Sequence, residues 1–122
     1  MIKKVSLADK HAALDSAWVP TVVAELNQQL VKVVRFEGEY VWHRHEHEDE
    51  MFLVTRGRIR ICLRDGEVSL GPGEFAVIPR GVEHKPVADE PADVVLFEPA
   101  ATRNTGDVDH DYTIEPGDLP RM

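Results

Sequence analysis

The stretch RIRICLRDGEVSLGPGEFAVIP, residues 58–79, indicates the fold class. Apolar and polar residues alternate through 58–64 and again through 67–71, which is the pattern of half-buried strands. The Asp65-Gly66 pair between them predicts a tight hairpin, because a primed two-residue turn needs positive φ. The glycines and proline at 71–73 then separate a further strand at 74–79. This stretch predicts antiparallel strands joined by short turns.

Further short runs of the same kind lie on both sides of this stretch. They are the segments 21–26, 30–37, 40–45, 50–56, 82–87 and 93–98. Many short strands with almost no helix predict an antiparallel sandwich or barrel. Four glycines are expected to be turn residues with positive φ, namely Gly57, Gly66, Gly73 and Gly81. Six large apolar residues are expected in the core: Phe36, Phe52, Phe75, Val77, Leu96 and Phe97.

One short helix is expected near the N-terminus. Ser6, with Asp9 three residues on, is a weak capping pair. Four side chains recur after it at three- and four-residue steps: Leu7, His11, Leu14 and Trp18. Pro20 closes this segment, His11 is expected at the surface, and Trp18 is expected on the outer face or against a partner subunit.

Length and composition predict a single domain over residues 1–122, with a barrel core at about 21–98 and a polar tail at 99–122 that drapes over the core or frays. The 14 basic and 22 acidic side chains give a formal net charge of −8, which argues against nucleic-acid and anionic-membrane partners. The N-terminal residues lack the apolar run of a signal peptide, and Cys62 is the single cysteine. A cytoplasmic location is expected.

The segment WHRHEHEDE, residues 42–50, carries the candidate site. On a strand, His43 and His45 would share one face. The polar residues 46–49 are interpreted as a hairpin loop, after which Glu50 begins a strand paired with 41–45. Two histidines and a carboxylate suit a divalent transition metal. His84, after the Arg80-Gly81 turn, is a fourth candidate, although the spacing only permits it to converge on the same point.

An exposed, charged strand end is the alternative interpretation of this segment. The spacing of residues around the histidines favours a metal site over a strand end, because it resembles a motif of the cupin superfamily. The family's first motif appears here as Gly38, four residues, His43-Arg44-His45, four residues, Glu50, six residues and Gly57. The gap after the first glycine is one residue shorter than the commonest form of the motif.

The second cupin motif appears as Gly73, five residues, Pro79-Arg80-Gly81, two residues and His84. The asparagine of that motif is replaced here by Ala88. Together the two motifs cover about residues 30–98. The resemblance implies a double-stranded β-helix, or jelly-roll, barrel. Because cupins of this size are usually homodimers, it also implies a homodimer.

The resemblance also implies four metal ligands, His43, His45, Glu50 and His84. The ion would be one divalent transition metal, Fe, Mn, Zn or Ni, and the ligand set does not choose among them. His47 has no counterpart in the motif and is expected to face solvent, and His110 in the tail is likewise expected at the surface.

Two functions of different classes are left open. One is a metal-dependent oxygenase or isomerase that acts on a small molecule, and the other is a non-catalytic module that binds a small ligand. A catalyst also needs a positioned acid or base. Glu39, Arg60, Glu98 and Tyr112 are candidates, and no spacing selects one of them.

Overall fold

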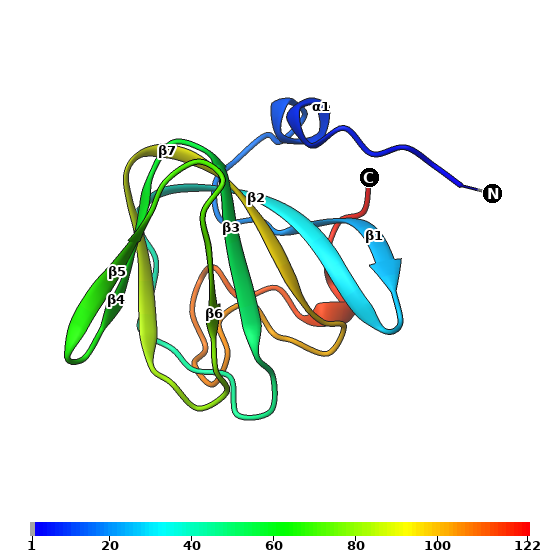
Figure 1. Ribbon diagram of the computed structural model, residues 1–122. Helices are drawn as coiled ribbons and strands as arrows, with labels where there is room; N and C mark the ends of the chain where they lie inside the picture. The colour runs from blue at the N-terminus through cyan, green and yellow to red at the C-terminus, as the bar shows by residue number, and fades with distance from the viewer. Residues whose placement is uncertain (1) are drawn as a thin grey trace.

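The computed structural model describes residues 2–122 and shows a mostly β jelly roll with one short helix (Figure 1). The elements are α1 (Leu7–Ala12), β1 (Thr21–Leu26), β2 (Gln29–Glu39), β3 (Glu50–Arg56), β4 (Ile59–Leu63), β5 (Gly66–Leu70), β6 (Phe75–Ile78), β7 (His84–Pro99) and the 3-10 turn η1 (Pro116–Asp118). The prediction of an all-β jelly roll with one N-terminal helix is therefore confirmed. Among the described residues, no helix has the length and apolar character to cross a membrane.

Strand β7 organises the sheet, because it joins both halves of the fold. Its first residues pair with β4, and its later residues pair with β2 on one side and β3 on the other. The sheet therefore runs β1-β2-β7-β3-β6, with the β4–β5 hairpin attached to β7 and extending away from the rest of the molecule (Figure 1). The strands predicted at 82–87 and 93–98 are joined in this one strand, except that residues 82 and 83 lie before it begins. Over residues 2–122 the hydrogen-bonded strand order does not close on itself, so the jelly roll is not a closed barrel.

The turns differ from the prediction in one place. In the β4–β5 hairpin, Leu63 pairs with Gly66, so the turn residues are Arg64 and Asp65. Gly66 belongs to β5, and the prediction of positive φ there is wrong. The residues with positive φ in a two-residue hairpin turn are instead Asn27 (φ 49°) and Gln28 (φ 66°), between β1 and β2. Positive φ is confirmed at 57, 73 and 81.

The core prediction holds for the strands that pack on both sides and is wrong for the edge strand β6. Phe36, Phe52 and Leu96 lie in the main buried cluster. Phe75 and Val77 are 61% and 53% exposed. Side chains alternate across a strand, and in β6 it is Ala76 and Ile78 that face the cluster. Phe97 is half-buried on β7.

The N-terminal segment packs against the sheet more closely than its sequence indicates. The capping prediction is confirmed, because the Ser6 side chain accepts a hydrogen bond from the backbone N–H of Asp9. The predicted surface position of His11 is wrong: its Nε2 lies 3.0 Å from the carbonyl oxygen of Val94 on β7. Trp18, with φ 64°, turns its indole into the core, where it donates to the Glu37 carbonyl.

The C-terminal segment 99–122 packs against the sheet and does not fray. Its backbone hydrogen-bonds to β1 at Val22 and to the β1–β2 turn at Gln28. Two of its own side chains, Thr102 and Thr105, are fully buried. The segment therefore covers one end of the jelly roll.

Gly57, between β3 and β4, provides a test of the fold. A Cβ atom there would lie 2.9 Å from the carbonyl oxygen of Pro91, and the residue has φ 82°. Gly57→Ala is expected to lower the free energy of unfolding by at least about 1–2 kcal/mol, since an L-residue is strained in this region. The control is Gly66→Ala, where an added Cβ would have no atom of the described residues within 4 Å. The free energy of unfolding is expected to change there by no more than about 0.5 kcal/mol. Equal losses in urea unfolding would contradict this account.

Candidate metal centre

Four polar side chains meet at one buried point, and they are the four predicted ones. His43, His45, Glu50 and His84 each offer one donor atom, and these atoms all lie within 4.8 Å of one another. All four side chains are buried, with at most 4% of any of them exposed. His47 and His110 are exposed, as predicted.

Backbone hydrogen bonds between two distant segments position the histidines. His43 and His84 exchange both backbone N–H to carbonyl bonds, at 3.1 and 2.9 Å. The carbonyl of His45 accepts from the N–H of Gly81 at 2.8 Å. Residues 40–45 otherwise form no regular strand, so the predicted strand there is wrong. The two cupin motifs are thus paired directly.

Glu50 reaches the site from a different direction than predicted. β3 pairs with β6 and β7, not with residues 41–45. The loop at 46–49 crosses to a separate strand, and Asp49 fastens it by accepting a hydrogen bond from the backbone N–H of Arg80 at 2.9 Å. The predicted face of β3 is nevertheless correct, because Glu50, Phe52 and Val54 are all buried.

The imidazoles of His43 and His84 are oriented as metal ligands usually are. Nδ1 of His43 lies 2.8 Å from the carbonyl oxygen of Val41, and Nδ1 of His84 lies 2.9 Å from that of Val82. A carbonyl only accepts, so each Nδ1 carries the proton and each Nε2 keeps a free lone pair. The Nε2 atoms of His43 and His84 are therefore available to bind a metal ion.

The inner atoms of the cluster have no hydrogen-bond partner. Nε2 of His45 and Nε2 of His84 lie 3.3 and 3.5 Å from the same carboxylate oxygen, Oε1 of Glu50. None of the three atoms makes an aligned hydrogen bond within residues 2–122. A buried unpaired polar atom costs about 1–3 kcal/mol. A cation would satisfy all three atoms at once, and the residues therefore fit a metal ion.

A family model described as the cupin domain matches residues 32–98. The chain belongs to the cupin family. It resembles a cupin-2 domain protein of known structure from Shewanella frigidimarina, with 43% identity and a TM-score of 0.77 over 78% of this chain and 93% of that one. Protein NMB1881 from Neisseria meningitidis has 26% identity and a TM-score of 0.74, over 80% of this chain and 99% of that one.

A curated relative of this cupin is the uncharacterised protein YdbB of Bacillus subtilis (strain 168). The two are 36% identical over 64 residues, which is 52% of this chain. The match spans 57% of YdbB.

Burial and mutual charge set the protonation of the cluster in this cupin. Burial, with a contribution from His84, lowers the pKa of His43 to about 4. Burial alone would lower the pKa of His45, but the nearby carboxylate of Glu50 raises it. Burial alone would raise the pKa of Glu50, but Glu98, His45 and His84 hold it well below its usual range. His43 and Glu50 therefore already have the ligating forms, while a proton on His45 would have to leave when a metal binds.

A buried ion pair lies behind Glu50. Nζ of Lys32 is 2.7 Å from Oε1 of Glu98, and both side chains are almost fully enclosed. Burial and the negative charge of Glu50 raise the pKa of Glu98 well above its ordinary value, and Lys32 opposes this. Of the four predicted acid–base candidates, Glu98 thus adjoins the cluster. Two others, Glu39 and Arg60, are engaged in exposed ion pairs elsewhere.

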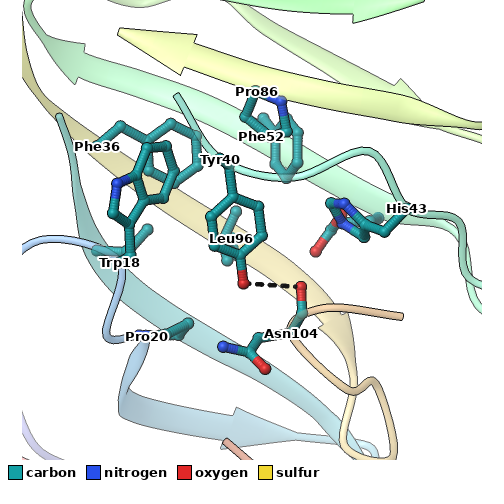
Figure 2. A pocket seen from close by; sticks show the side chains of 11 residues that line it. Trp18, Pro20, Phe36, Tyr40, His43, Phe52, Pro86, Leu96 and Asn104 are labelled. Carbon is teal, nitrogen blue, oxygen red and sulfur yellow. Dashed lines mark hydrogen bonds between the residues drawn. The ribbon is translucent and has the colours of Figure 1, made fainter. Parts of the chain in front are cut away.

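A small cavity of about 20 Å³ lies beside the cluster, with room for about one water molecule. Figure 2 shows His43 on one side of it, Trp18 and Phe36 on the other, and Tyr40 between them. The lining residues are Trp18, Pro20, Val34, Phe36, Tyr40, His43, Glu50, Phe52, Pro86, Leu96 and Asn104. The sequence identified the two ligands in this set but neither Trp18 nor Tyr40 as a site residue, because no motif marks isolated aromatic residues.

Tyr40 connects the cavity to the C-terminal segment. Its ring stacks on Trp18 at 4.6 Å and on Tyr112 at 5.5 Å. Its hydroxyl donates to the backbone carbonyl of Asn104 at 3.2 Å (Figure 2). Burial, followed by the charge of Glu50, raises the pKa of Tyr40, so the hydroxyl keeps its proton. Tyr112, the last acid–base candidate, is therefore part of the cover and not of the lining.

The same segment also clasps the His-x-His motif. The backbone N–H of Arg44 donates to the Asp107 carboxylate at 3.0 Å, and the N–H of Asp107 donates to the Arg44 carbonyl at 3.1 Å. Arg44 lies between the two ligating positions, so this contact restrains both histidines. No local pattern marks Asp107, which lies 63 residues after Arg44.

Proposed function

We propose that this cupin binds one divalent transition-metal ion through His43, His45, Glu50 and His84. The observation that carries the proposal is the set of three buried atoms without partners, the Nε2 atoms of His45 and His84 and Oε1 of Glu50. Imidazole nitrogens with one carboxylate suit Fe, Mn, Zn or Ni better than Ca or Mg. The tautomers fixed by Val41 and Val82 support the same function.

We further propose that the protein is a metal-dependent enzyme, an oxygenase or an isomerase, that acts on a small molecule at this centre. A bound metal ion would supply Lewis-acid polarisation or, for iron, oxygen chemistry. The chain itself would hold the metal ligands in place and keep bulk water from their inner side through Trp18 and Tyr40. The family resemblance supports a homodimer, and the exposed apolar side chains of Phe75 and Val77 on the edge strand β6 are compatible with one. A cytoplasmic location remains part of the proposal.

The second candidate function is a non-catalytic module that holds a small ligand. One observation favours it: among residues 2–122, none of the four acid–base candidates lines the cavity. A catalyst that transfers protons would need such a group, or one supplied by the ligands themselves.

Metal content tests the first part of the proposal. Protein purified without chelator is expected to carry about one transition-metal ion per chain, because the four ligands are already assembled at a buried site. Absence of metal, even after anaerobic loading with Fe, Mn, Ni or Zn, would overturn it. Oxygen uptake by the iron-loaded protein with catechols or thiols would then favour the oxygenase, while a ligand that is bound and never converted would favour the binding module.

A further inference from the structure

We propose that residues 104–113 are a lid, which is closed over the metal centre in this structure and has to move aside before a molecule larger than water can reach the ion. This inference rests on the proposed function, because the lid controls access to the proposed metal ion. The lid lies in the C-terminal segment, outside both cupin motifs and outside the residues 32–98 that the family model matches.

The centre is closed to small molecules in this arrangement of the chain. At most 4% of any of the four ligand side chains is exposed. The cavity of about 20 Å³ beside them has room for about one water molecule. A substrate has to contact the metal or its ligands in order to be converted. The chain therefore needs a second, open arrangement, as enzymes with mobile loops have.

The two ends of the lid meet at Tyr40, which lines the cavity. Asn104 also lines the cavity, and its backbone carbonyl accepts a hydrogen bond from the Tyr40 hydroxyl at 3.2 Å (Figure 2). Tyr112 stacks on the Tyr40 ring, with 7° between the ring planes. Movement of the lid would therefore release Tyr40 on both sides.

The middle of the lid lies directly against the His-x-His motif. A Cβ atom added at Gly106 would overlap the carbonyl oxygen of Arg44 and would come within 3.2 Å of Cδ2 of His43. Only a residue without a side chain allows this approach. Opening the lid would therefore uncover the ring of a metal ligand.

The lid is bonded internally and is attached to the body of the protein by few groups. Nδ2 of Asn104 donates to the Tyr112 carbonyl at 2.8 Å, which joins the two ends of the lid. Beyond the flanking residues 103 and 114, the hydrogen bonds from the lid to the rest of residues 2–122 go to Tyr40 and Arg44. The lid can therefore move as one unit while the strands stay paired.

Asp107 fastens the lid to Arg44. Its carboxylate accepts from the backbone N–H of Arg44 at 3.0 Å, and its own N–H donates to the Arg44 carbonyl at 3.1 Å. Asp107 is exposed, so water competes for these bonds, and each contributes little net stability. Such contacts can break and form again without unfolding the sheet.

Amide hydrogen exchange on the metal-free protein tests whether the lid opens. The amides of Arg44 and Asp107 donate across the boundary of the lid, so both become free when it opens. Both are expected to exchange at least about a hundredfold faster than amides in the middle of β7, at rates that low urea does not change, because local opening exposes little surface. Exchange of both amides at the β7 rate would overturn the inference, since the lid would then open only by global unfolding.

Asp107→Ala and Asp111→Ala are a matched pair that tests control of access. Asp111 is exposed in the same segment and lies outside the clasp with Arg44. In Asp107→Ala, zinc uptake and zinc transfer to excess EDTA are both expected to become about five- to tenfold faster with the affinity unchanged, since a lid alters both rates equally. Asp111→Ala should change neither rate. Faster release alone, or no change in Asp107→Ala, would overturn the inference, because Asp107 would then support the histidines and not control entry.

Metal analysis keeps the two proposals apart. If the protein binds zinc but the two rates do not follow the lid, the inference fails and the metal site stands. If the protein binds no metal, the proposed function fails. The exchange of the Arg44 and Asp107 amides then decides alone, and it supports the lid if it is local and overturns the lid if it is global.

Discussion

His84→Ala is expected to reduce bound transition metal from about one ion per chain to less than about a tenth, as measured by elemental mass spectrometry. His84 is fully buried, and its Nε2 is one of the three inner atoms without a partner. Removing the imidazole removes a ligand that Val82 holds in place. The backbone pairing with His43 does not depend on the side chain, so the second motif should stay in position.

The control for this experiment is His47→Ala. His47 lies two residues after His45 and is exposed, so its loss should leave the metal content unchanged. Glu50→Gln is a second test that keeps the size of the side chain and removes its charge, and it should weaken metal retention without opening a cavity. Full metal content in both His84→Ala and Glu50→Gln, or its loss in His47→Ala, would show that the metal is held elsewhere.

The sequence predicted the local parts of this site well because they depend on spacing. Alternation along the chain places Glu50 and Phe52 on one face of β3, and glycines with positive φ end the strands where they were expected. The two motifs also predicted which four side chains would meet. The route of Glu50 was predicted wrongly, since alternation says which face a residue takes but not which strand lies beside it.

Long-range partners were not predictable, and they complete the centre. Lys32 stands in the run LVKVVRF and looks like any outward-facing lysine of an alternating strand. Its partner Glu98 is 66 residues away, and Asp107 is 63 residues from Arg44. These contacts exist because β2 pairs with β7 and because the C-terminal segment returns to the site. Neither pairing leaves a local trace in the sequence.

Lys32→Met is expected to cost about 3–5 kcal/mol in the free energy of unfolding, because it leaves one partner of a buried ion pair without compensation. Lys32 is fully buried, and its Nζ lies 2.7 Å from Glu98. Without the lysine, the carboxyl group of Glu98 is buried beside Glu50 with no cation. Urea-induced unfolding in the presence of a chelator measures the loss apart from any effect of metal.

The loss should also depend on pH in a definite direction. Burial and the charge of Glu50 already raise the pKa of Glu98, and removing Lys32 removes the group that opposes this. A carboxyl group with a raised pKa in the folded chain keeps a proton that the unfolded chain releases, so the folded state loses stability as pH rises from the ordinary pKa through the raised one. The destabilisation by Lys32→Met is therefore expected to be larger at pH 8 than at pH 5.

Two comparisons separate loss of the pair from loss of a lysine. Lys85→Met removes the lysine of a surface ion pair with Glu39 and should have a much smaller effect. Lys32→Met/Glu98→Leu removes both buried charges and should regain most of the stability, since an apolar replacement of a buried pair is often neutral. If the double variant is no more stable than Lys32→Met, the cost lies in the packing of the lysine stem and not in an uncompensated carboxylate. In that case Glu98 does not depend on Lys32 to remain beside the metal ligand Glu50.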